Sequence, residues 1–344
     1  MMTYRVGVGL SGGTDSALAA KLLLEAGHDV IGFTMQLLPG CSVTAAKGAA
    51  VAARLGIPHR VLDMTDRFEE LVLTPFADAY RRGLTPSPCV CCNAQMKFGA
   101  MLDAMLAAGC ERVATGHYAR LVPAGDDTLL LRGRDPRKDQ SYFLAMLNAD
   151  QRRRAIFPLG DMLKKDVQAR AAALELVAPG EGESQDLCFL PDGDFAAFVA
   201  ARYPELSREG WIVTSDGTRL GRHSGAYQYT RGQRRGLGLG GGPWFVLRVD
   251  IADNLVVVGR QDDLLSRNVI LQDVNWLLPP PAAGAELPVQ AQVRYLMQAR
   301  PATLRRLDDS RAEIVFADPV SAVTPGQLAA AYLDDRVVAG GWIC

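Results

Sequence analysis

The chain has 344 residues, of which 49% are hydrophobic, so it is long enough for two or three domains with packed cores. Its 37 basic and 38 acidic residues give a formal net charge of -1, which neither requires nor excludes a polyanionic partner such as RNA. Because no stretch reaches the roughly 20 apolar residues of a membrane span and no signal-peptide pattern opens the chain, we expect a cytoplasmic protein with no membrane partner.

The first informative segment is S-G-G-T-D-S at residues 11–16, between a predicted strand at residues 4–10 and a predicted helix at residues 17–24. Two glycines permit a tight turn that directs backbone amides and the positive helix end at an anion, and Asp15 suits a phosphate bridged by a metal ion. The segment lacks the lysine and the spacing of a Walker A loop, which argues against a kinase or GTPase. A Gly-Ser turn without a ligand is the alternative, but the flanking strand and helix favour pyrophosphate binding.

Strand-like and helix-like segments alternate through the next hundred residues. The further strands are expected at residues 30–35, 59–62 and 112–117, and the further helices at residues 44–55, 66–80 and 97–108. This alternation is typical of the α/β class, in which helices cover a parallel sheet. Ligands bind such sheets at the carboxyl ends of the strands, so we expect residues 11–16, Met35 and Gly116-His117 to converge on one crevice.

The character of the sequence changes beyond about residue 190. Hydrophobic runs at residues 244–249 and 255–258 flank Asp253-Asn254, which predicts a hairpin. Short strand-like segments separated by Pro, Gly and Asp continue to the C-terminus, as in a small β-barrel. We therefore predict three domains: a parallel-sheet nucleotide-binding domain at residues 1–195, a small central β-rich domain at residues 196–265, and a C-terminal β-barrel at residues 266–344.

Three of the seven cysteines crowd one proline-rich segment, T-P-S-P-C-V-C-C-N at residues 85–93. Cys89 and Cys92 form a C-x-x-C pair directly before a predicted helix, whose N-terminus favours thiolates. The pair suits half of a zinc site, a redox dithiol, or ligation of an iron–sulfur cluster. Structural zinc is the least favoured of these, because the sequence has no second C-x-x-C pair.

Further motifs follow in order along the chain: A-T-G-H-Y at residues 114–118, K-D-Q-S-Y-F-L at 138–144, S-Q-D-L-C-F-L at 184–190, Y-T-R-G-Q-R-R-G-L-G at 229–238 and T-P-G-Q at 324–327. Together with the S-G-G-T-D-S loop and the cysteine segment, they make the chain resemble the tRNA-specific 2-thiouridylases, a family of PP-loop ATP pyrophosphatases. The resemblance runs nearly end to end. It implies a PP-loop nucleotide-binding domain, a small central domain and a C-terminal β-barrel that together bind a tRNA anticodon arm.

The resemblance implies an ATP-dependent sulfurtransferase that converts the wobble uridine of tRNA, at the first anticodon position, to 2-thiouridine. Cys92 matches the family's catalytic nucleophile, and Cys188 matches the cysteine that receives persulfide sulfur. The implied ATP site, with Mg²⁺ as cofactor, consists of Gly9, Leu10, Ser11, Gly12, Gly13, Thr14, Asp15, Ser16, Met35 and Gly116. The implied tRNA contacts are Ser87, Pro88, Cys89, His117, Lys138, Asp139, Gln140, Arg294, Tyr295 and Gln327. Without the resemblance, His117 would be interpreted as a satisfied core histidine.

The implied reaction explains these residue types. A uridine 2-carbonyl oxygen is a poor leaving group, so its replacement requires adenylation by ATP, with loss of a pyrophosphate that the loop stabilises. Sulfur must then arrive as a nucleophile, for which two schemes stay open. Either Cys92 attacks the Cys188 persulfide and leaves a disulfide, or Cys89, Cys92 and Cys188 bind a [4Fe-4S] cluster that carries the sulfur. In either scheme we expect a persulfide donor or relay protein as a partner besides tRNA.

Two other functions compete with sulfur transfer. A PP-loop ligase or amidotransferase acting on a small molecule would consume ATP but would have no use for the three cysteines. A non-catalytic RNA-binding protein would release no AMP. Local basic clusters that could contact RNA phosphates include Arg152-Arg153-Arg154 and, in a Gly-rich turn, Arg234-Arg235, and we favour the second as an RNA contact.

Overall fold

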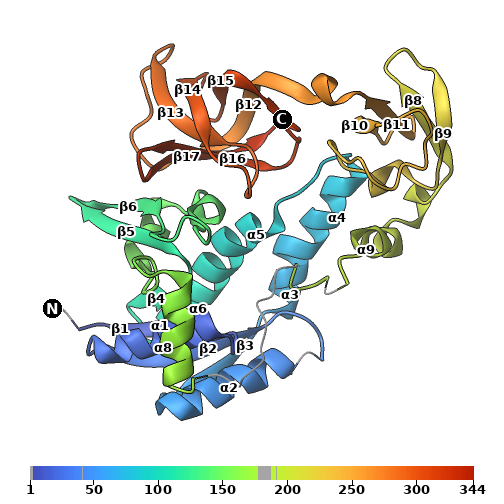
Figure 1. The fold of residues 1–344 in the computed structure, drawn as a ribbon. Helices are drawn as coiled ribbons and strands as arrows, with labels where there is room; N and C mark the ends of the chain where they lie inside the picture. The colour runs from blue at the N-terminus through green and yellow to red at the C-terminus, as the bar shows by residue number, and fades with distance from the viewer. Residues whose placement is uncertain (1–2, 41, 177–186, 191) are drawn as a thin grey trace. The chain divides into compact units, whose positions relative to one another are not determined.

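The computed structural model describes residues 3–40, 42–176, 187–190 and 192–344 (Figure 1). Residues 184–186 of the S-Q-D-L-C-F-L motif lie outside the described residues. The chain forms two compact units, each built from several segments. The first unit comprises Met1–Val72, Cys89–Gln185 and Asp335–Val338, and the second comprises Leu73–Pro88, Asp186–Asp334 and Ala339–Cys344.

The first unit is built on a five-stranded sheet in which every pairing is parallel. The strands lie in the order β3 (His59–Asp63), β2 (Asp29–Gln36), β1 (Arg5–Gly9), β4 (Arg112–Ala114) and β7 (Ala155–Ile156). The α/β prediction is therefore confirmed. Because the chain moves outward from β1 to β3 and then returns to the other side of β1 with β4, the strand order reverses between β1 and β4. In an open parallel sheet this switch point is where ligands bind.

Alternate residues of β1 point to opposite faces of the sheet, and each face is covered by helices. Val6 and Val8 are fully buried in a hydrophobic core to which α1 (Thr14–Glu25), α2 (Val43–Leu55) and α8 (Lys164–Ala173) contribute. On the other face lie the glycines of β1: a Cβ on Gly7 would lie 2.7 Å from the sulfur of Met105 in α6 (Met101–Ala107). Glycine at this position therefore permits close packing of α6 on the sheet.

Further elements of the first unit lie between these strands. After the short helix α3 (Thr65–Phe68) and the π-helix η1 (Glu69–Leu73), the second unit contributes a segment, and α5 (Pro88–Cys91) then leads into the π-helix η2 (Cys92–Ala100). A hairpin of β5 (Ala119–Ala124) and β6 (Asp127–Arg132) follows β4, and then come the 3-10 helix η3 (Ser141–Leu144) and α7 (Ala149–Arg154). This hairpin was not among the predicted elements.

Arg152 belongs to a basic run at residues 152–154 but is buried by contacts with another element of the fold. Its side chain is only 2% exposed and forms an ion pair of 2.9 Å with Asp127. It also donates hydrogen bonds to the carbonyl oxygens of Thr128 and Leu147. Arg152 therefore joins α7 to the hairpin, whereas Arg153 and Arg154 lie on the exposed side of the helix and pair with Asp150.

The second unit contains α4 (Thr74–Arg81), α9 (Phe195–Arg202), the 3-10 helix η4 (Pro204–Leu206) and two β-structures. The smaller sheet has the order β10 (Phe245–Asp250), β11 (Leu255–Gly259), β8 (Gly210–Thr214) and β9 (Arg219–His223), and the 3-10 helix η5 (Ala226–Gln228) follows β9. Strands β10 and β11 pair antiparallel on either side of Asn254, whose φ of 52° suits a tight turn. The predicted hairpin at Asp253-Asn254 is thus confirmed.

The C-terminal strands form a closed antiparallel barrel, as predicted. The 3-10 helix η6 (Gln261–Leu264) leads into it, and its strands are β12 (Leu265–Trp276), β13 (Glu286–Gln292), β14 (Arg300–Arg306), β15 (Ala312–Ser321), β16 (Leu328–Leu333) and β17 (Arg336–Ile343). Their order is β12-β15-β14-β13-β16-β17, and pairing of β12 with β17 closes the barrel. The interior is filled by large side chains such as Leu304, Phe316 and Tyr332, each at most 1% exposed. Closure removes the open sheet edges that would otherwise invite aggregation.

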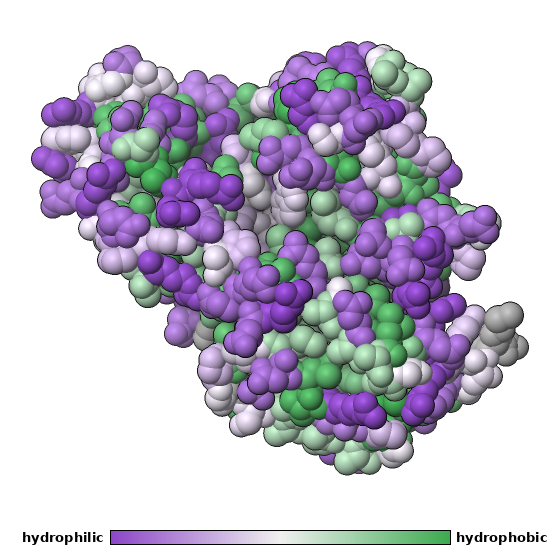
Figure 2. Space-filling model, turned by 180° about the vertical axis from the view of Figure 1, so that it is seen from behind, coloured by the Kyte–Doolittle hydropathy of each residue, from purple (hydrophilic) through white to green (hydrophobic). Residues whose placement is uncertain are grey.

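The surface mixes side chains of both kinds. On the face shown in Figure 2, hydrophilic and hydrophobic residues are interspersed. Within the part of the chain that the structure describes, none of the helices has both the length and the apolar character needed to cross a membrane.

Candidate active site

The S-G-G-T-D-S segment forms a tight loop between β1 and α1. Gly12 has a φ of 82°, and a Cβ at this position would lie 2.3 Å from the Cβ of Lys47 in α2, so only glycine fits. The loop is closed by the Ser16 hydroxyl, which donates to the carbonyl oxygen of Gly13 at 3.0 Å and lies 3.2 Å from the Ser11 hydroxyl. Gly13 is the N-cap of α1 and has no side chain with which to satisfy the first amides of the helix. Those amides point at the place where an anion would bind.

A second set of contacts fixes the end of β1 from the neighbouring strands. The hydroxyl of Thr34, a residue of β2 that is 1% exposed, donates a hydrogen bond of 2.7 Å to the carbonyl oxygen of Leu10. The same hydroxyl lies 2.9 Å from Nε2 of His59 in β3. Because the Thr34 proton is used on Leu10, His59 must donate from Nε2. Burial lowers the pKa of His59, which favours the neutral ring.

Gly116 lies two residues after the end of β4 and contacts the start of α1. A Cβ on Gly116 would lie 2.9 Å from the carbonyl carbon of Asp15 and 3.0 Å from the amide nitrogen of Ser16. The expected convergence of the segments after β1 and β4 is therefore seen at this contact. Met35 lies near the end of β2, where it pairs with Leu62 of β3 and is half-buried.

Asp15 has two partners that the sequence did not suggest. The hydroxyl of Tyr118 donates to Oδ1 of Asp15 at 2.7 Å, and Nζ of Lys164 lies 2.8 Å from both carboxylate oxygens. Carboxylate oxygens are the ligands that Mg²⁺ prefers, so Asp15 also suits a metal that bridges phosphates. Tyr118 is the last residue of the A-T-G-H-Y motif, part of which was predicted to reach this site. Lys164 lies 149 residues from Asp15 in the sequence, and no motif around it predicts the contact.

His117 lies on the same segment as Gly116 but points into the core. It is 7% exposed, its Nδ1 lies 2.6 Å from the Thr115 hydroxyl, and its ring contacts those of Phe98 and Phe157. Burial, with a smaller contribution from the charge of Lys97, lowers the pKa of His117 well below 6.5. This environment is the one expected for a satisfied core histidine, and its contact with tRNA stays a prediction.

The cysteine segment forms the start of a long helical stretch. Cys89 and Cys91 lie in α5, and Cys92 begins η2, where the backbone is π-helical. π-helical turns occur frequently at functional sites. Cys89 is exposed, and Cys91 and Cys92 are half-buried.

The thiols of Cys92 and Cys91 differ in their electrostatic surroundings. Burial raises the pKa of Cys92, while the charge of Lys97 acts in the opposite direction. Burial and the neighbouring Cys92 raise the pKa of Cys91 to about 11. Lys97 donates to Oδ1 of Asn93 at 2.9 Å, and Asn93 in turn donates to the carbonyl oxygen of Phe143. Lys97 is therefore a positioned cation near Cys92, and it lies outside the cysteine motif at residues 85–93.

Cys188 belongs to the second unit and is exposed. The next residue, Phe189, is 8% exposed and packs edge-on against Phe76 of α4, with ring centroids 5.1 Å apart. The ring centroid of Phe198 in α9 lies 5.6 Å from that of Phe189. This aromatic cluster anchors the chain immediately beside the Cys188 thiol.

Among the residues that the structure describes, no group of three or more His, Cys, Asp or Glu side chains is close enough together to hold a metal ion. The cluster scheme for Cys89, Cys92 and Cys188 therefore receives no support from the described part of the chain. It stays one of the two schemes to be tested.

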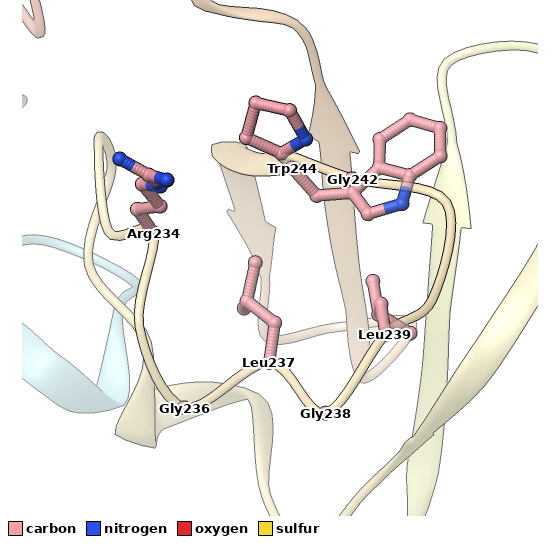
Figure 3. Close-up of a pocket in the computed structure, with 8 residues that line it drawn as sticks. Arg234, Gly236, Leu237, Gly238, Leu239, Gly242 and Trp244 are labelled. Carbon is pink, nitrogen blue, oxygen red and sulfur yellow. The ribbon is translucent and has the colours of Figure 1, made fainter.

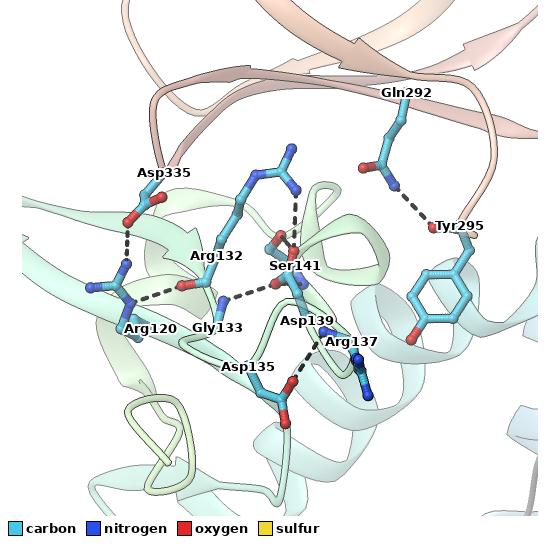
Figure 4. A network of polar contacts seen from close by, with 10 residues as sticks. All are labelled: Arg120, Arg132, Gly133, Asp135, Arg137, Asp139, Ser141, Gln292, Tyr295 and Asp335. Carbon is cyan, nitrogen blue, oxygen red and sulfur yellow. Dashed lines mark hydrogen bonds and ion pairs between the residues drawn. The ribbon is translucent and has the colours of Figure 1, made fainter. Parts of the chain in front are cut away.

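Several residues expected to contact tRNA form internal hydrogen bonds. Asp139 accepts from the backbone of Gly133 and Ser141 and from the Ser141 hydroxyl, at 2.9 to 3.0 Å, and lies 3.6 Å from Arg132 (Figure 4). Burial raises the pKa of Asp139, and these bonds oppose the shift. Gln140 accepts from the backbone amide of Tyr118 at 3.0 Å. Both side chains thus stabilise the loop that carries Lys138.

The network around Asp139 borders a polar cavity of about 540 Å³ in the first unit. Arg120 crosses its edge, donating to the carbonyl oxygen of Arg132 at 2.8 Å and to Asp335 at 2.6 Å (Figure 4). Arg134, which also lines the cavity, is exposed and donates to the carbonyl oxygen of Asp161. The cavity is therefore lined by arginines and carboxylates that already pair with one another.

In the second unit, Gln327 stabilises the segment that precedes the cysteines. Its amide donates to the carbonyl oxygens of Thr85 and Pro86 at 3.0 and 3.1 Å. Ser87, which follows, is 8% exposed, and Pro88 begins α5. The remaining expected contacts lie in the loop after β13, where Arg294 is exposed and Tyr295 is half-buried.

The Gly-rich turn after η5 surrounds a second cavity, of about 490 Å³ (Figure 3). Trp244 lies on one side of it, with the guanidinium of Arg260 3.9 Å from the ring centroid. Arg234 lies on the other side and is exposed, as is Arg235. Exposed arginines and an aromatic ring beside a glycine-rich backbone are features suited to contacting an RNA backbone.

A parallel sheet with a glycine-rich anion loop at its switch point defines the class: a nucleotide-binding protein of the PP-loop type. Family models agree in order along the chain, with a tRNA methyl transferase HUP domain matching residues 4–192, a tRNA methyl transferase PRC-barrel domain matching residues 196–260 and an aminomethyltransferase beta-barrel domain matching residues 266–343. The chain belongs to the tRNA-specific 2-thiouridylase family.

Full-length relatives support this assignment. The protein named tRNA-specific 2-thiouridylase MnmA from Trichlorobacter lovleyi is 43% identical, over 98% of this chain and 97% of the relative. Those from Paramagnetospirillum magneticum and Desulforudis audaxviator are 43% and 44% identical, over 99% and 98% of this chain and 95% and 98% of their own lengths. A solved structure described as a predicted subunit of tRNA methyltransferase from Methanocaldococcus jannaschii is similar over 59% of this chain and 87% of its own length. The sequence identity is 19% and the TM-score is 0.34, which is too low to inform the fold.

Proposed function

We propose that this protein is an ATP-dependent tRNA sulfurtransferase that converts the uridine at the first anticodon position to 2-thiouridine. The observation that carries the proposal is that one chain of this family combines a pyrophosphate loop at the sheet's switch point with Cys92 and Cys188. A loop for adenylation alone would suit many ligases. Thiols in the same chain supply the nucleophile that replaces an activated carbonyl oxygen by sulfur.

In the proposed first step, the uracil 2-carbonyl oxygen attacks the α-phosphorus of ATP, and pyrophosphate leaves. The ATP site comprises the segment Gly9–Ser16 with Met35 and Gly116. Loop amides and the positive end of α1 stabilise the departing pyrophosphate. Asp15 is the side chain that would ligate Mg²⁺, which offsets phosphate charge when bound.

In the proposed second step, sulfur reaches the activated carbon and AMP leaves. The sulfur first arrives on Cys188 as a persulfide, delivered by a donor or relay protein. The Cys92 thiolate attacks the inner sulfur of that persulfide, so a Cys92–Cys188 disulfide forms and hydrosulfide is released to attack the uridine. A cellular thiol then reduces the disulfide. In the alternative scheme, Cys89, Cys92 and Cys188 bind a [4Fe-4S] cluster that carries the sulfur.

For substrate binding, we propose that some of the expected tRNA contacts are direct and that others act indirectly. Cys89, Lys138 and Arg294 would approach the RNA directly, because these side chains lie on loops or at the start of a helix. Asp139, Gln140 and Gln327 would act through the loops that their hydrogen bonds stabilise. We further propose domain limits at residues 195 and 265 and a cytoplasmic location, where tRNA is available.

The proposal is tested by replacing the thiols one at a time and analysing the nucleosides of tRNA after reaction with ATP, Mg²⁺ and a persulfide donor. Cys92→Ser and Cys188→Ser should bind tRNA normally and form no 2-thiouridine, whereas Cys344→Ser, at the exposed C-terminus, should behave as wild type. Normal 2-thiouridine formation by Cys188→Ser would refute both sulfur schemes. ATP–pyrophosphate exchange that is independent of tRNA would instead favour a small-molecule ligase.

A further inference from the structure

The anion site contains an ion pair with a lysine that lies outside the loop motif. Nζ of Lys164 lies 2.8 Å from both carboxylate oxygens of Asp15, and the Tyr118 hydroxyl donates to Oδ1 at 2.7 Å. The Lys164 side chain is 10% exposed, whereas the Asp15 side chain is 34% exposed. The lysine of the pair is therefore buried, whereas the carboxylate is partly open to solvent.

The fold delivers Lys164 to this place by helix packing. Lys164 is the first residue of α8, and Val167 and Ala171 follow it at the i+3 and i+7 positions of the same helix face. Both lie in the core that α8 shares with α1. The backbone amide of Lys164 donates to Oδ2 of Asp135 at 2.9 Å, which fixes the start of α8. Lys164 is thus aimed at α1 by the same face that buries the helix.

Asp15 alone would oppose the binding of phosphate. It lies in the first turn of α1, beside the loop amides, where its negative charge would repel a pyrophosphate group. A buried ammonium is costly unless it is paired, so the position of Lys164 implies an anionic partner at all times. Asp15 is that partner in this structure, and it lies in the first turn of α1, just after the loop glycines.

We propose that Lys164 is a phosphate-binding residue of this site, which neutralises Asp15 in the absence of nucleotide and contacts the β- and γ-phosphates of ATP and the released pyrophosphate when they bind. Lys164 thereby supplies, from residue 164, the positive charge that a Walker A loop supplies from within its motif. Mg²⁺ on Asp15 would leave the lysine available to the phosphates. This inference rests on the proposed use of ATP.

The test measures binding by calorimetry with three ligands: ATP with Mg²⁺, pyrophosphate with EDTA, and adenosine. Lys164→Met should weaken the binding of ATP and pyrophosphate about 10- to 100-fold, as expected for loss of a charge-assisted hydrogen bond. Adenosine carries no phosphate, so its affinity should not change, which also shows that the variant is folded. Lys165→Met removes the adjacent, exposed lysine of the same helix and should bind all three ligands as wild type does.

A double variant separates phosphate binding from a purely structural role and serves if Lys164→Met alone does not fold. In EDTA, Asp15→Asn should bind pyrophosphate more tightly than wild type, because a negative charge is removed. Asp15→Asn/Lys164→Met should bind it about 10- to 100-fold more weakly than Asp15→Asn does. Equal affinity of these two variants would overturn the proposal and make Lys164 only a partner of Asp15. A wild-type protein that binds ATP but forms no 2-thiouridine would refute the proposed function without touching this inference.

Discussion

Gly116→Ala tests the contact between the segment after β4 and the start of α1. The added Cβ would lie 2.9 Å from the carbonyl carbon of Asp15, 3.0 Å from its Cβ and 3.0 Å from the amide nitrogen of Ser16. Ordinary contacts begin at 3.4 Å, so either segment must move by about 0.5 Å (3.4 - 2.9). Two of the three atoms are backbone, which cannot rotate away. Overpacking of this kind costs about 1–3 kcal/mol of folding free energy.

The displacement falls on the loop amides that would bind pyrophosphate, so function should suffer more than stability. Because a displacement of about 1 Å can cost about 100-fold in rate, we expect ATP affinity and kcat/KM to fall about 10-fold or more. Calorimetric titration with ATP measures the first, and a tRNA thiolation assay measures the second. Gly240→Ala, in the other unit, is the matched control for the ATP titration, since a Cβ there meets nothing within 4 Å. Wild-type ATP affinity in Gly116→Ala would refute the reasoning.

Three further predictions concern other parts of the molecule. Lys97→Met should raise the pKa of Cys92 further, because the Lys97 charge lowers it, and should move the pH profile of Cys92 alkylation to higher pH in a Cys89→Ser/Cys91→Ser background. Burial keeps the pKa of His117 well below 6.5, so below pH 6.5 the unfolded chain binds a proton that the folded chain does not. As the pH falls below 6.5, the free energy of unfolding of the wild type should therefore decrease by about 1.4 kcal/mol per pH unit more than that of His117→Phe, as measured by urea titrations. Arg234→Glu/Arg235→Glu should weaken tRNA binding and reduce the slope of log affinity against log salt by about 1.5, as for two lost phosphate contacts.

Each of these predictions has a contrasting outcome. An unchanged alkylation profile in Lys97→Met would mean that the lysine does not act on Cys92. Equal acid sensitivity of wild type and His117→Phe would place the responsible groups elsewhere, with His59 and His223 as the next candidates, because burial lowers their pKa as well. For RNA binding, Arg153→Glu/Arg154→Glu makes the same change in charge on exposed residues of α7. A larger loss of tRNA affinity in that control would reverse our preference between the two clusters.

The periodic parts of the fold could be predicted from the sequence, because the physics that determines them is local. Strand β1, the loop at residues 11–16 and helix α1 follow from a hydrophobic run, two glycines and a helical pattern. The hairpin at Asp253-Asn254 follows from turn chemistry, and the C-terminal barrel from short, evenly spaced strands. The hairpin of β5 and β6 was not predicted, since Pro123 interrupts the strand-like pattern of β5.

The candidate site was predictable only in its loop and its thiols. Lys164 was missed because its contact with Asp15 depends on the packing of α8 against α1, which no local pattern encodes. The loop motif itself contains no lysine, but the fold places Lys164 beside it. Thr34 was missed for the same reason, whereas Lys97 lies only five residues beyond Cys92 in η2, and its effect on the thiol depends on the helical geometry of that segment. Conversely, the burial of Arg152 and His117 comes from neighbours distant in sequence, so basic or polar residues that look available for RNA can be structural.

Reconstitution with defined components tests the central claim most directly. Purified protein, unmodified tRNA, ATP, Mg²⁺ and a persulfide donor are incubated without air, and AMP, pyrophosphate and 2-thiouridine are quantified together. The proposed mechanism predicts one AMP and one pyrophosphate for each 2-thiouridine formed, and no product when ATP is omitted. Formation of AMP and pyrophosphate without any 2-thiouridine, or of 2-thiouridine without ATP, would contradict it.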